Sequence, residues 1–595
     1  MDKSKKKHAK EGLRRLAFCL LTFIFSFQPS GAFAQSEAQY RYLDATQLWR
    51  LTDNAAGLGL DAGARDLNKA IGDPQTRVYN RGYAEFALEH RSGDYHRVQE
   101  GGQRNQLTFE TERYQRIGHF LVGYGHFLFG MDRTKDRAWA DVMRPYDSNP
   151  FYSGSNVSGK YDQQLFDLTA AISTIPIPLA GGKADRELTL GMRLDYKVGD
   201  LSRLRDPRSR SELLDYKIAP GVTYSFGHNA IGLSGYYNRR KEKIPNMTTV
   251  QTDPNLMYYQ MYGLGEATGT VGGYSGYQCE WVNHQFGAEL TYSLTSHDSP
   301  TPNPSRGGEG SIYNNRGEGR VDVTTPLPPE GGGGGGASSL NSISIARGVE
   351  DVWGQYKFSP GRYTSYIYKA ASRNRLGKGR LLHALDLEAQ WQQGYADEYR
   401  QQLIQEKDPD KGYTSYRYET QIEYRKRQQL TTLDAQLHYR LSLLCCDPVA
   451  TLPESAAPAI AGYAGFLARL SGSTNKHLLP ASELKHQRLD LSLEGGYGLL
   501  HSRLWLDATA TYSHATKASL DLADPTTEIA RQVLLPDMHY YDADYFRGQL
   551  SVKYLFPLKL KGYRSTFYVK AYGDLISAQH SFDRKTVGLT FGLYN

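Results

Sequence analysis

The acidic and imidazole side chains near residue 540 could hold a metal ion. Carboxylate oxygens with one imidazole nitrogen can bind Ca²⁺ or a transition-metal ion. The spacing does not follow an EF-hand loop, and an acidic loop beside a strand is also a common solvated surface. We therefore treat the cluster as a weak candidate metal site and predict no cofactor. Its members are Asp537, His539, Asp542 and Asp544.

A second candidate site is the tyrosine-rich stretch between residues 257 and 277. Tyrosine rings can stack against a sugar or enclose an apolar ligand. The same rings can instead pack on one another or lie at the rim of a membrane. The candidate ligand residues are Tyr258, Tyr259, Tyr262, Tyr274 and Tyr277.

The sequence signatures of common enzymes are absent. The chain has no G-x-S-x-G elbow, no H-E-x-x-H motif and no phosphate-binding loop. His119 and His126 are seven residues apart, so a strand would direct them to opposite faces. We predict that the protein is not an enzyme. A membrane hydrolase, whose residues meet only in the folded chain, is a distant alternative.

The elements that would position these side chains are amphipathic β-strands. Between residues 187 and 197, apolar and polar side chains alternate at every position. A strand sends successive side chains to opposite faces, so one face is apolar and the other polar or charged. The same alternation recurs at 416–425, 433–441, 488–494 and 545–556.

Two architectures can use such strands. A soluble sandwich buries the apolar faces between two sheets, whereas a transmembrane barrel turns them toward lipid and encloses a wet lumen. In a barrel, the charged faces would either pair across neighbouring strands or set the selectivity of a pore. The candidate lumen-lining residues are Glu187, Arg193, Asp195, Arg417, Glu419, Glu423 and Arg425.

The lengths of the connections favour the barrel. Short connections are expected at 117–118, 176–185 and 227–229, and they alternate with longer polar ones at 92–103, 132–160, 200–212 and 244–277. Short turns on one side and long loops on the other are typical of outer-membrane barrels. We predict an all-β fold: a single antiparallel transmembrane β-barrel of about 16–18 strands, with long extracellular loops and no separate plug domain.

Composition agrees with this class. The chain has 44 tyrosines, which suit the aromatic girdles of a barrel. A mean hydropathy of −0.57 excludes a polytopic helical membrane protein. The net charge is +7, but residues 1–34 hold seven basic and two acidic side chains, so most of this charge lies in that stretch. Nothing in the charge supports nucleic-acid binding.

The chain divides into three expected parts. Residues 1–34 resemble a signal peptide, with a basic start, an apolar run and a small-x-small site at Ala32-Phe33-Ala34. Residues 35–76 form a periplasmic lead-in or a segment inserted in the lumen. Residues 77–595 form the barrel and include a flexible Gly/Pro-rich loop at 299–341. That length suggests an external loop, which would require one more barrel strand, such as Asn255 to Tyr262.

The last strand has a further implication. Val587, Leu589, Phe591 and Leu593 alternate with polar and glycine residues close to Asn595. A carboxy-terminal amphipathic strand of this kind is similar to the strand read by the barrel-assembly machinery, although the final residue is Asn rather than the common aromatic. Such a strand could equally be the closing strand of any β protein.

Four short motifs resemble an outer-membrane β-barrel family of the Bacteroidota whose function is unknown. They are Asp53-Asn54-Ala55-Ala56-Gly57-Leu58, Val78-Tyr79-Asn80-Arg81-Gly82, Asn149-Pro150-Phe151-Tyr152 and Gly159-Lys160-Tyr161. The resemblance implies a barrel in the outer membrane, but no activity and no functional residues.

Two functions follow from these expectations. The first is a channel, or an accessory to one, for solute passage across the outer membrane. The alternative is a non-conducting barrel that docks a surface protein or a TonB-dependent uptake system. The expected partners are outer-membrane lipid, the barrel-assembly machinery and such a protein, with no nucleic acid.

Overall fold

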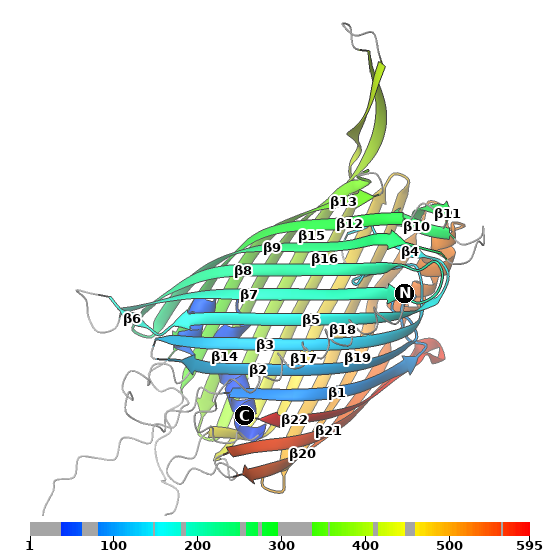
Figure 1. The fold of residues 1–595 in the computed structure, drawn as a ribbon. Helices are drawn as coiled ribbons and strands as arrows, with labels where there is room; N and C mark the ends of the chain where they lie inside the picture. Colours follow the sequence, from blue (N-terminus) through cyan, green and yellow to red (C-terminus); the bar gives the residue numbers. More distant parts are fainter. Residues whose placement is uncertain are drawn as a thin grey trace, which may run out of the picture.

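The protein folds as a β-barrel with a short segment inside it (Figure 1). The computed structural model describes residues 37–61, 81–118, 120–146, 149–179, 186–249, 257–271, 277–295, 336–354, 358–407, 414–446, 458–560 and 563–594. Tyr274, His119 and most of the 299–341 stretch lie outside the described residues. None of the described helices is both long and apolar enough to cross a membrane.

Eighteen antiparallel strands form the wall, and β1 pairs with β22 to close it. This count lies within the expected range, and the closed wall excludes a two-sheet sandwich. The strands are β1 (Arg81–Gly93), β2 (Gln103–Ile117), β3 (Leu121–Arg137), β5 (Gly159–Thr174), β7 (Arg186–Arg203), β8 (Arg210–Phe226), β9 (Asn229–Met247), β12 (Tyr277–Thr295), β13 (Ala337–Gly354), β14 (Gly361–Lys378), β15 (Leu381–Lys407), β16 (Thr414–Cys446), β17 (Pro458–Leu478), β18 (Ala481–Leu499), β19 (Leu504–Asp521), β20 (Tyr545–Leu560), β21 (Tyr563–Ala578) and β22 (Asp583–Tyr594).

The two ends of the barrel differ. At one end, called the turn end, Gly118 and Gly227 adopt positive φ in short connections, and β1 begins and β22 ends. The other end, called the loop end, carries the connections 94–102, 138–158, 248–276 and 522–544. Thr295 donates its backbone N–H to the His228 carbonyl at 2.9 Å, so the connection after β12 leaves from the turn end. The extra barrel strand expected within 255–262 is therefore wrong. β10 (Met257–Gly263) pairs instead with β11 (Glu266–Val271) and β4 (Ser153–Ser155) in a separate small sheet.

The alternation seen in the sequence becomes an outward and an inward face. Leu190, Phe286 and Leu493 are among the exposed apolar side chains of the outward face. Their neighbours along each strand, such as Arg193 and Glu289, contact the segment inside the barrel. Because β1 pairs with β22, every strand of the described wall has a strand partner on each side, so the sheet has no edge strand.

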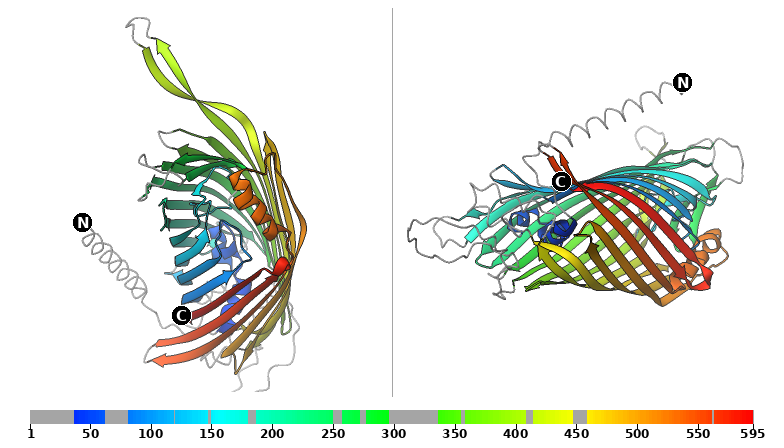
Figure 2. Two further views of the ribbon diagram at one scale, coloured as in Figure 1. Left: turned by 90° about the vertical axis from the view of Figure 1, so that its right-hand side faces the viewer. Right: turned by 90° about the horizontal axis from the view of Figure 1, so that it is seen from below.

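Two strands extend past the rim. The alternating stretches 416–425 and 433–441 are separate in the sequence pattern, but both belong to the single strand β16. β15 pairs with β14 only as far as Glu398, and β17 pairs with β16 only from Gln428. Beyond these points β15 and β16 pair only with each other, in a hairpin that projects from the loop end (Figures 1 and 2). We call residues 399–424 the projecting hairpin.

Polar and aromatic loops build a layer at the loop end. Trp139 packs with Tyr259 and Met261 of β10 and with Val533, which belongs to the π-helical turn η5 (Ala530–Leu534). The helix α3 (Leu535–Asp542) follows that turn, and a short helical turn η6 (Gln579–Ser581) joins β21 to β22. We call residues 138–158, 257–271 and 522–544 the loop-end cap. The two-residue strand β6 (Ile177–Pro178) lies beside β7 at the turn end.

Candidate functional site

The lumen of the turn-end half contains residues 37–61, which we call the lumen segment (Figure 1). It consists of helix α2 (Glu37–Thr46) and two 3₁₀ turns, η1 (Trp49–Leu51) and η2 (Ala55–Leu60). Helix α2 packs on β17, and η2 packs on β3, β5, β7 and β8. Every contact with the wall described below involves an inward-facing side chain or a close backbone approach.

Helix α2 is anchored by a buried ion pair. Glu37, only 3% exposed, accepts a hydrogen bond from Lys553 of β20 at 2.8 Å and another from the Tyr594 hydroxyl. Burial alone would raise the pKa of Glu37, but the charges of Lys553 and Arg41 outweigh it and lower the pKa to about 2. Arg41 also pairs with Asp507 of β19 at 3.0 Å and lies over the Trp505 ring. The start of the helix is therefore tied to three strands.

The 3₁₀ turn η2 rests on a surface of small residues. A Cβ atom on Gly191 of β7 would lie 2.4 Å from the backbone nitrogen of Ala56. A Cβ atom on Gly221 of β8, directly opposite Gly191 in the ladder, would lie 2.2 Å from the Asn54 side chain. Both distances are below real contact distances, so only glycine allows the segment to approach these strands so closely.

Asn54 is buried and holds the turn to the wall through its side chain. Its amide oxygen accepts the Ala56 N–H and so begins η2, as an N-cap residue does. Its amide nitrogen donates to the Thr223 hydroxyl at 3.1 Å and to the Thr291 hydroxyl at 3.4 Å. A single residue thus both shapes the turn and fixes it to β8 and β12.

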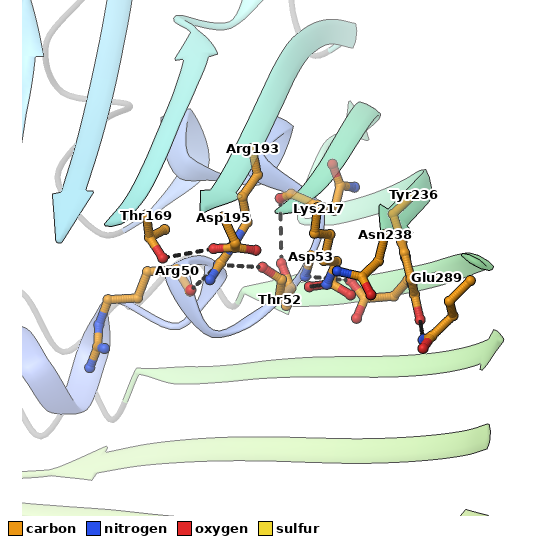
Figure 3. A network of polar contacts seen from close by, with 12 residues as sticks. Arg50, Thr52, Asp53, Thr169, Arg193, Asp195, Lys217, Tyr236, Asn238 and Glu289 are labelled. Carbon is orange, nitrogen blue, oxygen red and sulfur yellow. Dashed lines mark hydrogen bonds and ion pairs between the residues drawn. The ribbon is translucent and has the colours of Figure 1, made fainter. Parts of the chain in front are cut away.

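A charged network runs along the lumen segment beside this turn (Figure 3). Asp53 pairs with Lys217 of β8, and its N–H donates to a Glu289 carboxylate oxygen at 3.0 Å. Arg193 of β7 donates to the carbonyls of Arg50 and Thr52 at 3.2 and 3.3 Å. Strands β7, β8 and β12 therefore hold the loop between η1 and η2 by charged and amide groups.

Apolar contacts complete the anchoring. Trp49 and Leu48 are buried against Ala230 and Leu340 of the wall. Leu58 packs with Tyr114 and Val122, and the Tyr114 hydroxyl donates to the Leu58 carbonyl at 2.6 Å. The segment is therefore a packed part of the fold.

The candidate lumen-lining residues fall into two groups. Arg193 and Asp195 lie on the inward face, where Arg193 pairs with Asp195 and reaches the lumen segment. Glu187 lies on the same face of β7, near the turn end. Arg417, Glu419 and Glu423 lie on the projecting hairpin, and Arg425 lies at its base, before β16 meets β17. The described strands form no closed wall around these four residues, which places them beyond the rim of the barrel.

Tyr258, Tyr259 and Tyr262 lie on β10 in the loop-end cap, and Tyr277 begins β12 beside it. Tyr258 is fully buried and packs against Tyr277, with ring centroids 4.8 Å apart. Tyr259 packs on Trp139 with centroids 4.7 Å apart, and its hydroxyl donates to Glu528. Tyr262 is half-buried and meets Phe151 edge to face. Tyr258 and Tyr277 therefore belong to the packed core, whereas Tyr259 and Tyr262 line a cleft at the loop end.

The candidate metal residues do not converge. The buried Asp537 carboxylate accepts the Val98 N–H at 2.8 Å, whereas Asp544 accepts from the Ala515 N–H at 2.7 Å and contacts His514. The His539 ring instead packs edge to face against His580. Among the described residues no group of three or more His, Cys, Asp or Glu side chains is placed to hold a metal ion.

Family comparison identifies the chain. The model of a family of unknown function (DUF6850) matches residues 70–595, so the protein belongs to that family. No curated protein matches the chain. The family match leaves out the lumen segment, whose residues 37–61 precede it.

Solved structures of outer-membrane proteins are similar at low identity. CdiB from Acinetobacter baumannii is 9% identical with a TM-score of 0.31, over 86% of this chain and 60% of that one. The copper transporter OprC is 8% identical with a TM-score of 0.30, over 86% and 80%. The siderophore receptor PirA from Pseudomonas aeruginosa is 8% identical with a TM-score of 0.28, over the same shares. The chain thus spans less than two thirds of the length of CdiB.

Proposed function

We propose that this protein is an outer-membrane channel for small polar solutes, held closed by the lumen segment. Support for the location comes from the outward face, whose exposed apolar side chains suit lipid around a closed wall. In this proposal the turn end faces the periplasm, the loop end faces outward, and β22 carries the signal for barrel assembly. The chain has no catalytic role in this proposal.

One observation carries the proposal of a channel. Inward-facing charged pairs away from the lumen segment keep substantial exposure: Lys197 and Asp167 are 31% and 27% exposed, and His126 and Glu110 are 23% and 26% exposed. The described residues therefore do not fill this part of the lumen. A barrel of 16–18 strands is wide enough for an aqueous path.

The lumen segment is the element that must move. Charged and amide groups hold the loop between η1 and η2, and each hydrogen bond to a charged group contributes about 1.5–3 kcal/mol net. When these contacts break, water in the lumen can replace them. We therefore expect a mostly closed channel with rare openings.

A single steric change tests this proposal. Gly191→Val places a side chain where the backbone of Ala56 lies, so η2 must leave its seat. The matched control is Gly548→Val, because a Cβ atom on Gly548 of β20 meets nothing within 4 Å. In planar bilayers we expect long openings from Gly191→Val and wild-type behaviour from Gly548→Val. A correctly folded Gly191→Val barrel that stays sealed would contradict the proposal.

The projecting hairpin supports a second candidate function, docking of a surface protein or an uptake system. Leu403, Tyr416 and Ile422 are 51%, 63% and 46% exposed beyond the rim, where β15 and β16 have no other strand partner. Such an exposed two-stranded ribbon suits pairing with another protein. Replacing residues 399–424 by a tight turn should release a partner that copurifies after mild extraction. A wild-type barrel that migrates alone would argue against docking.

A further inference from the structure

A cleft of about 670 Å³ opens at the loop end, between the loop-end cap and the base of the projecting hairpin. Segments far apart in sequence line it: Trp139, the β10–β11 hairpin, Phe358, the base of the projecting hairpin and the three residues just before η5. This volume is typical of sites for small molecules. The cleft is separate from the lumen segment, which lies in the turn-end half.

The cleft has an aromatic floor. Trp139 and Tyr259 pack on each other and are almost fully buried, so they form a rigid base with Ile529. Tyr262 and Tyr399 are half-buried and line the sides. Aromatic rings of this kind provide flat apolar surface at small cost in side-chain entropy.

The rim of the cleft is rich in hydrogen-bond acceptors. Four carboxylates line it: Glu266, Glu398, Glu423 and Glu528. Ionised carboxylates only accept hydrogen bonds, so they favour a ligand with many donors. Thr268, Thr527 and Gln401, which also line the cleft, can both donate and accept.

The charges of these carboxylates are partly balanced already. Arg427 lies 3.0 Å from Glu266 and also pairs with Glu398. Arg400, which itself lines the cleft, lies 3.8 Å from Glu423. Glu528 accepts hydrogen bonds from three neutral donors, Tyr259, Asn156 and Gln532. A ligand that fits this cleft therefore donates hydrogen bonds and covers apolar rings. A neutral polyol does both without adding charge to the cleft.

We propose that this cleft binds a carbohydrate, with one sugar face on the half-buried rings of Tyr262 and Tyr399 and its hydroxyls donating to the rim carboxylates. A sugar ring combines an apolar C–H face with equatorial hydroxyl donors, which matches a floor of rings beside a rim of acceptors. Hydrogen bonds to charged acceptors are about twice as strong as neutral ones. This inference goes beyond the proposed channel and does not depend on it.

Calorimetric titration of the full chain tests this site. The detergent must not be a glycoside, because a sugar headgroup would compete for the cleft. The probes are oligosaccharides of four to six units from starch, cellulose, xylan and chitin, with spermidine as a cationic probe. We expect at least one oligosaccharide to bind and spermidine to bind weakly or not at all.

Two variants assign the binding to the cleft. Tyr262→Ala removes a side ring and should weaken binding about tenfold, since such stacking contributes about 1.4 kcal/mol. Glu528→Gln preserves shape and should weaken binding several-fold, which gives a second test if Tyr262→Ala folds poorly. Tyr416→Ala is the matched control, because Tyr416 is 63% exposed on the projecting hairpin and does not line the cleft.

Each contrary outcome overturns the carbohydrate site. Binding of spermidine alone would identify an amine site. Binding of an oligosaccharide that neither Tyr262→Ala nor Glu528→Gln weakens would place the sugar elsewhere. Absence of binding by every oligosaccharide would leave the cleft without the proposed ligand.

Discussion

Glu37 of the lumen segment and Lys553 of β20 form a buried ion pair, with Nζ and Oε2 2.8 Å apart and side chains 3% and 11% exposed. These residues are separated by most of the chain, yet the pair joins the first described helix to a strand near the carboxyl end. A buried pair contributes little when both partners are present, but losing one partner leaves a charge uncompensated.

Acid should release helix α2. The pKa of Glu37 is lowered from 4.5 to about 2, so its stabilising contribution is complete above about pH 5. That contribution is lost as the pH falls from 4.5 toward 2, and it amounts to about 3 kcal/mol at most. Hydrogen exchange over residues 37–46, corrected for the intrinsic effect of pH, should rise in this window.

Asp44→Asn, which removes a half-exposed partner of Arg50, should leave that window unchanged. Glu37→Gln should abolish the acid transition, and an unchanged transition in that variant would refute the assignment.

Loss of one charge on the wall should open the proposed channel more often. Lys217→Met removes the cation beside Asp53, and the partly exposed pair contributes on the order of 1 kcal/mol. We expect roughly fivefold more frequent openings in planar bilayers. Lys197→Met is the matched control, because the ion-pair partner of Lys197 is Asp167 of the inward wall rather than a residue of the lumen segment. If both variants increased the frequency of openings equally, opening would not depend on the contact with Asp53, and the prediction would be wrong.

The barrel itself follows from the alternation of side chains, but the limits of each strand do not. Tyr416, Ile422 and Tyr424 alternate with charged residues as regularly as Leu433 and Leu437 do. Only the strand partners distinguish these stretches, because β17 accompanies β16 from Gln428 onward. A charged face outside the rim and a charged face in the lumen have the same pattern, so the pattern does not show that Arg417 and Glu423 lie beyond the rim.

The lumen segment could be predicted only in part. The Asp53–Leu58 motif is visible in the sequence, while its position in the lumen depends on Gly191 and Gly221 from distant strands. Inward-facing glycines within an alternating strand are a usable signal, because they mark a close backbone approach. The metal prediction failed to gain support for a related reason: Asp537 and Asp544 point to different partners, which spacing along the chain does not reveal.

The loop-end cap should loosen as the pH rises toward neutrality. Burial raises the pKa of Asp537 from 3.8 to about 7. The folded state therefore retains a proton that the unfolded chain loses, and stability falls between pH 3.8 and 7 by up to about 4 kcal/mol. Asp537→Asn keeps an acceptor for the Val98 N–H and should remove this dependence. Hydrogen exchange of residues 94–102 and 535–542 at pH 5 and pH 8 measures it, and similar protection at both pH values in the wild type would contradict the prediction.

A charge on the outward face distinguishes lipid from water around the barrel. Leu493 of β18 is 66% exposed, and Leu493→Arg would face the hydrocarbon if the barrel spans a membrane. Arginine on the lipid face of such a barrel costs about 2–4 kcal/mol near the midplane. Tyr416→Arg is the control, since Tyr416 is 63% exposed beyond the rim and should tolerate the charge. The heat-dependent shift in gel mobility measures the fraction of protein that folds into lipid vesicles. This fraction should drop for Leu493→Arg and not for Tyr416→Arg. If Leu493→Arg instead folded as well as Tyr416→Arg and gained solubility without detergent, water rather than lipid would surround this face, and the proposed channel would lose its membrane.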